Sequence, residues 1–104
     1  WGRDHPKVIN RREMNAMTGA CLMTRRDLYD KVGGLDESYT IGNFEDVQYC
    51  LTAKVLGHRV VYQPNACLYH FSGGSGNSET ARFNEQLFRI KCGKITEYDE
   101  WKFW

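Results

Sequence analysis

Apolar residues recur every four positions near the middle of the chain, and this spacing predicts the principal helix. Val47, Leu51 and Val55 fall on one face of a helix that ends before Gly57. Asn43 is suited to the N-cap position, because its side chain can accept a hydrogen bond from an unpaired N–H of the first turn. We therefore predict a helix between Asn43 and Gly57 with one buried face.

Two further helices are predicted from capping residues and glycines. Thr24 and Asp27 match a capping pattern at the start of a short helix over residues 25–32, which Gly33 and Gly34 end. A later helix begins at Asn77 or Ser78, and Gly93 closes it. It runs to Ile90 or Cys92, with an apolar stripe of Phe83, Leu87, Phe88 and Ile90 or Lys91.

Short apolar runs predict the strands. Residues 16–23 are typical of a buried strand, in which Gly19 marks either a close approach of another group or a bulge. Residues 58–63 and 66–70 are also strand-like, whereas the lead-in through Arg12 is polar and irregular. The pattern as a whole predicts an α/β domain with a small mixed sheet covered by about three helices.

Length and charge indicate one small domain and exclude some partners. The 104 residues, 12.1 kDa, are enough for a single core, so residues 1–104 form one domain. The net charge of +1 and the absence of a basic run argue against nucleic acid as a partner. No long apolar segment occurs and the chain opens on polar residues, so we expect neither a transmembrane segment nor a signal peptide. Because the chain opens on Trp1 rather than Met, we expect it to be part of a longer polypeptide.

The four cysteines lie in apolar segments without CxxC spacing. We expect Cys21, Cys50, Cys67 and Cys92 to be reduced and buried, as in a cytoplasmic protein, with no zinc or disulfide role.

Two segments fall outside the periodic pattern. The tail, residues 94–104, holds four aromatic side chains that we expect to pack on this domain, on a partner chain or on another part of the same protein. Before the last helix, Gly73, Gly74 and Gly76 lie in a Gly/Ser/Asn segment that forms either a mobile lid or an inert linker.

Glu45 and Asp46 are the candidate reactive carboxylates, because they lie in the first turn of the principal helix. Unpaired backbone N–H groups favour carboxylates there, so the pair is equally ordinary for a helix start. His70, at the end of the last strand-like run, is either a metal ligand or a hydrogen-bonded structural residue.

Six motifs in order resemble the C-terminal half of the family 2 glycosyltransferases. The resemblance covers residues 17–74, more than half of the chain. It implies part of a GT-A fold and of an inverting enzyme that uses a nucleotide-sugar. The motifs are Met17–Met23, Arg25–Leu28, Val32–Asp36, Glu45–Val47, Leu56–Pro64 and Tyr69–His70.

The resemblance also implies roles for the candidate residues. Asp46 is the expected general base, taking the proton of an acceptor hydroxyl. Glu45, Gly19 and Ala20 are the expected acceptor-binding residues. His70 is expected to help hold Mn²⁺ or Mg²⁺ on the donor diphosphate in the complete enzyme. The glycine segment corresponds to a loop that orders over bound nucleotide.

Two departures from the family pattern limit what the chain can do alone. Gln48 replaces an acid commonly found two positions after the base. The nucleotide-binding half and its Asp-x-Asp motif, which would precede Met17, are absent. We therefore expect the acceptor-side portion of a glycosyltransferase, inactive alone, that needs the missing N-terminal half or a homo-oligomer.

Two other interpretations belong to different functional classes. A non-catalytic glycosyltransferase-like module would use its uncovered surface to dimerise or bind a protein partner. A phosphate cradle over residues 69–82 is disfavoured, because it lacks both the Gly-Lys-Ser/Thr of a P-loop and the third glycine of a dinucleotide fingerprint.

Overall fold

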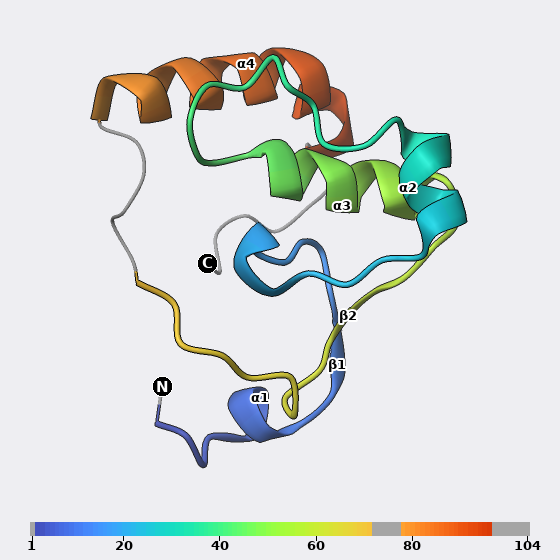
Figure 1. Ribbon diagram of the computed structural model, residues 1–104, viewed down its shortest axis with the longest axis vertical. Coiled ribbons are helices and arrows are strands. Elements are labelled where there is room, and N and C mark those ends of the chain that lie inside the picture. The colour runs from blue at the N-terminus through green and yellow to red at the C-terminus, as the bar shows by residue number, and fades with distance from the viewer. Residues whose placement is uncertain (1, 72–77, 97–104) are drawn as a thin grey trace.

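The computed structural model describes residues 2–71 and 78–96, which form four α-helices, one 3₁₀ turn and two strands (Figure 1). The α/β class is confirmed, and the small sheet in this part of the chain is antiparallel rather than mixed. In chain order the elements are α1 (Pro6–Ile9), β1 (Arg12–Met14), η1 (Gly19–Cys21), α2 (Arg26–Val32), α3 (Glu45–Val55), β2 (Val60–Tyr62) and α4 (Ser78–Thr96).

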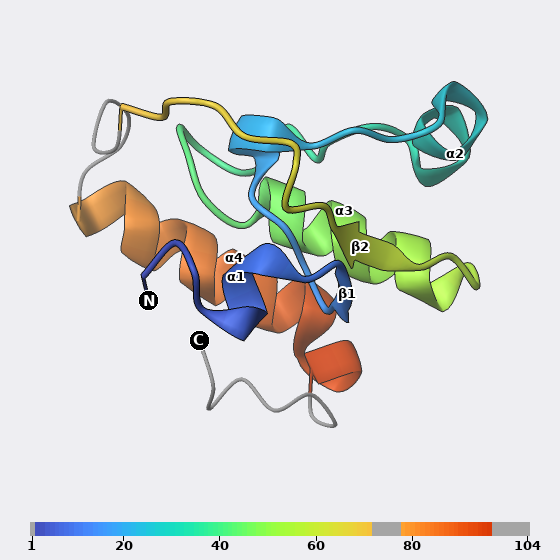
Figure 2. The ribbon, with the colours of Figure 1, turned by 90° about the horizontal axis from the view of Figure 1, so that it is seen from below.

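Helix α3 lies between α4 on one side and the sheet with η1 on the other (Figures 1 and 2). Leu51 is 1% exposed and packs toward α4, whereas Cys50 packs toward the sheet. Val47 contacts both sides. The cluster under α4 consists of Tyr39, Leu51, Phe88 and Cys92, and the cluster under the sheet of Ala16, Cys50 and Val60. Burial therefore fixes α3 on two sides.

The start of α3 differs from the prediction. Phe44, not Asn43, occupies the N-cap position, and no side chain caps the helix there. Three consecutive residues have positive φ: Gly42 at 72°, Asn43 at 81° and Phe44 at 78°. Non-glycine residues in this conformation cost on the order of 1 to 3 kcal/mol each. The ring of Phe44 stacks on that of Phe88 in α4, with centroids 5.1 Å apart.

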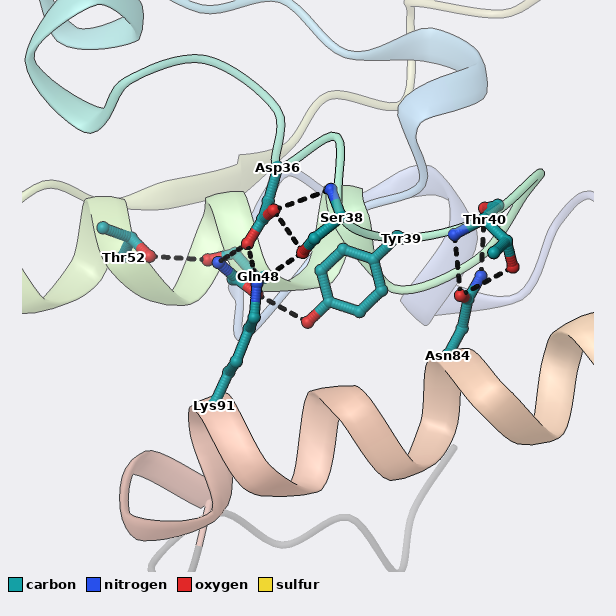
Figure 3. Close-up of polar contacts among 8 residues, drawn as sticks. All are labelled: Asp36, Ser38, Tyr39, Thr40, Gln48, Thr52, Asn84 and Lys91. Atoms are coloured by element: carbon teal, nitrogen blue, oxygen red, sulfur yellow. Dashed lines mark hydrogen bonds and ion pairs between the residues drawn. The ribbon is translucent and has the colours of Figure 1, made fainter.

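The side chain of Asn84, in α4, holds this strained loop. It is 0% exposed. Its Oδ1 accepts from the backbone N and the hydroxyl of Thr40, and its Nδ2 donates to the Thr40 carbonyl (Figure 3). The same Nδ2 also donates to the carbonyls of Gly42 and Asn43. One amide from another element thus holds the loop that precedes α3.

The strands also differ from the prediction. Residues 16–23 form no strand, because Thr18 caps the 3₁₀ turn η1 through its hydroxyl and the chain bends there. The strand β1 comes earlier, beginning at Arg12 where an irregular lead-in was expected, and it pairs with β2 in the register Arg12 to Tyr62. β2 lies within the predicted run 58–63, whereas residues 66–70 are extended but outside any sheet.

The start of α2 also differs from the prediction, whereas its end agrees with it. Arg25 is the N-cap of α2, since Thr24 instead bonds the hydroxyl of Tyr49 and Asp27 pairs with Arg25. Gly33 ends α2 in the left-handed conformation, as predicted.

In α3 and α4 the buried faces are rotated from the predicted ones. Val55 is 66% exposed, and Phe83 and Ile90 are 50% and 82% exposed. The buried positions of α4 are Asn84, Phe88 and Cys92, and the helix continues past Gly93.

Two of the four cysteines are buried as expected. Cys50 and Cys92 lie in the core, and burial raises the pKa of both thiols. Cys21 and Cys67 are exposed, contrary to the prediction, because η1 and the segment after β2 lie on the surface. All four are free thiols. The predicted lid glycines and most of the aromatic tail lie outside the described residues.

Removal of the Asn84 amide should destabilise the fold. Asn84→Ala removes the partner of four backbone groups of Thr40, Gly42 and Asn43, so we expect the free energy of unfolding to fall by about 2 to 4 kcal/mol. Urea denaturation followed by circular dichroism measures it. Gln86→Ala, at an exposed position of the same helix, is the control and should change it by less than about 0.5 kcal/mol. Equal midpoints for the two variants would contradict the role of Asn84.

Candidate functional site

Asp46 and Gly19, 27 positions apart in the sequence, meet in the structure. The backbone N of Gly19 donates to Oδ2 of Asp46 at 2.7 Å. The other carboxylate oxygen, Oδ1, accepts from the N of Val47 at 2.8 Å. A Cβ at Gly19 would lie 3.3 Å from Cβ of Asp46. Gly19 therefore permits a close approach and is not a strand bulge.

Asp46 opens onto a cavity of about 660 Å³ between β1 and the start of α3. This volume lies within the range of about 300 to 1,000 Å³ that small-molecule sites occupy. Most of its walls are apolar, and Asp46 and Arg12 are its charged groups. The lining residues are Arg12, Met14, Ala16, Met17, Thr18, Asn43, Phe44, Asp46, Val47 and Tyr62.

Glu45, although adjacent to Asp46, lines a different cavity. This second cavity, about 770 Å³, lies between α2, α3 and the loop after Gly33. Glu45 shares a helix face with Gln48, Tyr49 and Thr52, because positions three and four apart align on a helix. Its Oε2 is buried and has no hydrogen-bond partner among the described residues. The two carboxylates therefore point to separate spaces.

Gly19 and Ala20 line a third cavity, about 540 Å³, that extends along residues 17–24 toward β2. Both residues are exposed. Gly19 reaches Asp46 through its backbone, while the N of Ala20 bonds the hydroxyl of Thr18. The structure thus brings Gly19 to Asp46 but places Glu45 and Ala20 on other cavities.

A polar network braces α3 opposite the Asp46 cavity (Figure 3). Gln48 accepts a hydrogen bond from the hydroxyl of Tyr39 and donates one to Asp36, which also binds Lys91 and Ser38. These bonds, that of Lys91 first, hold the pKa of the Asp36 carboxyl well below its usual range. Burial, with smaller contributions from nearby acidic groups, raises the pKa of Tyr39 to about 12.

The network gives Gln48 a structural role at the position where the family commonly has an acid. An amide can donate to the Asp36 carboxylate and accept from Tyr39 at once, whereas a second carboxylate could only accept.

His70 lies exposed on the extended segment after β2. Among the described residues, no three His, Cys, Asp or Glu side chains gather closely enough to hold a metal ion. One imidazole is too small a donor set for a divalent cation. The described residues therefore do not by themselves fit the expected Mn²⁺ or Mg²⁺ site.

The family model for glycosyltransferase like family 2 matches residues 3–93. The chain belongs to this family. The match extends beyond the residues 17–74 that carry the motif resemblance and includes β1 and most of α4.

A relative in Sinorhizobium fredii (strain NBRC 101917 / NGR234), the uncharacterized protein y4gI, is 37% identical over 86 residues. The alignment covers 78% of the family 2-like chain and 10% of y4gI, so the chain spans about a tenth of that relative's length. No solved structure matches the chain. In the described part of the chain, no helix combines the length and apolar character that spanning a bilayer requires.

Sequence reasoning missed three residues of this family 2-like site. Asn84 was overlooked because a polar residue in a helix normally faces water, although its spacing of four from Phe88 could have placed it on the buried face. Arg12 and Tyr62, cross-strand partners in the sheet, were not recognised as cavity residues. The alternation of Arg12 with Met14 was the available signal.

Adding a branched side chain at Gly19 should displace the Asp46 carboxylate. Because a Cβ there is already in tight contact with Asp46, we expect Gly19→Val to lower the free energy of unfolding by about 1 to 3 kcal/mol. Amide hydrogen exchange at position 19 should accelerate more than at neighbouring amides, since its acceptor moves away. Ala20→Val, at an exposed position in the same turn, is the control. Unchanged exchange at position 19 would contradict the contact.

The lowered pKa of Asp36 predicts a stability that declines in acid. Its ionised form is favoured in the fold, so the stabilisation is complete above the unfolded-state pKa of about 3.9 and is lost as the pH falls toward the folded pKa. Asp36→Asn should therefore lower the free energy of unfolding by about 1 to 3 kcal/mol at neutral pH.

This deficit should shrink between about pH 5 and about pH 2, measured by urea denaturation at a series of pH values. Asp30→Asn, which removes an exposed ion pair with Arg26, is the control, and we expect it to change stability by about 0.5 kcal/mol or less. A deficit for Asp36→Asn that stays constant with pH would contradict the assignment.

Proposed function

We propose that this chain forms the acceptor side of a sugar-transfer site, in which Asp46 is the general base. The contact between Asp46 and Gly19 carries the proposal. A carboxylate held by two backbone N–H groups has a fixed orientation, and each of its oxygens keeps a lone pair for an acceptor hydroxyl.

The surroundings of Asp46 support this role. The carboxylate lies in the first turn of α3, which positions it at the start of the helix. It also lines a cavity large enough for a small molecule. The strained loop before α3, held by Asn84, fixes where this turn begins.

In the proposed reaction the acceptor hydroxyl loses its proton to Asp46 as its oxygen attacks the anomeric carbon of a nucleotide-sugar. The bond from that carbon to the nucleoside diphosphate breaks on the opposite face, so the configuration inverts. The diphosphate leaves with the electron pair, and Asp46 later releases the proton to water. Glu45 opens to another cavity and is not assigned to the same hydroxyl.

A second candidate function, binding of a protein partner without catalysis, is favoured by the segment after β2. Leu68 is 50%, Tyr69 98% and Phe71 92% exposed, on extended backbone outside the sheet. Such a segment can add a strand to another chain. It suits a second copy or the N-terminal half of a longer enzyme.

The test of the catalytic proposal is Asp46→Asn in the protein joined to its nucleotide-binding half. We expect the turnover number to fall by about 10² to 10⁴, because asparagine cannot take the proton but still accepts from the Gly19 N–H. Donor affinity, measured by calorimetry, should stay unchanged. Asp27→Asn, an exposed carboxylate on α2, is the matched control. Full turnover in Asp46→Asn would remove Asp46 from the role of base.

A further inference from the structure

The side chain of Arg12 is half-buried beside the ring of Tyr62. Its Nε is shielded from water and lacks a hydrogen-bond partner among the described residues. The guanidinium lies over the ring of Tyr62, and the distance from Arg12 Cζ to the ring centroid is 5.6 Å. Shielded charged donors are normally paired, so a group in this state calls for an explanation.

Arg12 lies on the wall of the cavity that Asp46 also lines. On β1, Arg12 and Met14 alternate onto the same side of the backbone, and Ala16, after the strand, lines the same cavity. The charge therefore lies beside apolar side chains. Phe44 belongs to the same lining. The cavity therefore combines one cation and one anion with mostly apolar walls.

We propose that this cavity recognises an acceptor that carries an anionic oxygen group, a phosphate or a carboxylate, which binds Arg12. The proposal rests on the function assigned to Asp46 and names the substrate class of that site. The acceptor hydroxyl lies at Asp46, and an apolar face of the acceptor covers Met14 and Phe44.

Charge complementarity carries this choice. Arginine stays protonated at all working pH values and presents planar donors that match the paired oxygens of a carboxylate or phosphate. A neutral acceptor would leave the Arg12 donors unpaired, and a cationic one would be repelled. The apolar walls strengthen the ion pair, because they exclude water from it.

The stacking on Tyr62 supports the assignment. A planar ring against the guanidinium restricts its rotation without using any of its hydrogen-bond donors. Because Tyr62 is the cross-strand partner of Arg12 in the sheet, the pairing of β1 with β2 fixes the two side chains together. Arg12 is thus held against Tyr62 on the wall of the cavity.

The experiment titrates the ¹⁵N-labelled chain with three probes and follows amide shifts. The probes are methyl glucuronide, which carries a carboxylate, hexyl phosphate, and the neutral methyl glucoside. We expect one or both anions to shift amides of Met14, Met17 and Phe44, and the neutral sugar to bind at least about tenfold more weakly. The stronger anion identifies the source of the charge, a sugar acid or a phosphate.

Variants of Arg12 decide whether it is the receptor. Arg12→Gln should weaken anion binding by about tenfold to a hundredfold. Arg12→Lys keeps the charge but not the planar donors, so its loss should be smaller. Arg11→Gln, at the neighbouring exposed position, is the control and should bind like the wild type. Equal affinity for the neutral probe, no binding of either anion, or an unchanged affinity in Arg12→Gln would overturn the proposal.

Failure of the anionic-acceptor proposal can be distinguished from failure of the catalytic proposal, because anion binding is measured without any nucleotide-sugar donor. Arg12-dependent binding in a protein whose turnover survives Asp46→Asn would contradict only the base. Loss of turnover in Asp46→Asn, together with anion affinity that Arg12→Gln leaves unchanged, would contradict only the anionic acceptor.

Discussion

The buried amide of Asn84 is the interaction on which the start of α3 depends. Four of its five hydrogen bonds satisfy backbone groups of Thr40, Gly42 and Asn43, and the fifth comes from the Thr40 hydroxyl. They hold a loop that contains two non-glycine residues at positive φ. No side chain of the loop caps the helix, so the loop is held instead by these bonds from α4. The orientation of Asp46, two residues after Phe44, follows from this clamp. The Asn84 amide thus contributes both to the buried core and to the position of the candidate catalytic residue.

Helix α3 also separates two chemical environments. On one side Asp46 meets the backbone of Gly19 beside an apolar cavity, and on the other Glu45 faces a cavity with further acidic groups. Adjacent residues on a helix are about 100° apart around its axis, so neighbouring carboxylates need not act on the same molecule. Gln48, on the Glu45 side of α3, reinforces the separation because its neutral amide donates a hydrogen bond to Asp36. Glu45 and Asp46 are thus adjacent in the sequence but line different cavities.

Apolar spacing was sufficient to place α3, and a capping residue to place the start of α4, although the buried faces of both helices are rotated from the predicted ones. It failed for residues 16–23, since a short apolar run is compatible with either a strand or an irregular segment around a 3₁₀ turn. Gly19 was correctly suspected of a close approach, but its partner 27 positions away had no local signature. Asn84 was missed for the same reason, because its acceptors lie more than 40 positions earlier. The family motifs identified the candidate carboxylates but not the cavities that they line.

The contacts of α4 bear on the order in which the molecule can assemble during synthesis. Thr40 bonds Asn84, which lies 44 positions later in the sequence, and Asp36 binds Lys91, which lies 55 positions later. Closing loops of this length is entropically unfavourable until the helix that supplies the partners is present. A nascent chain that has not yet released α4 from the ribosome already contains Arg12, Gly19 and Asp46, yet it lacks the clamp that sets the geometry before α3. The loop that orients the start of α3, and with it Asp46, therefore reaches its final geometry only when α4 packs against α3.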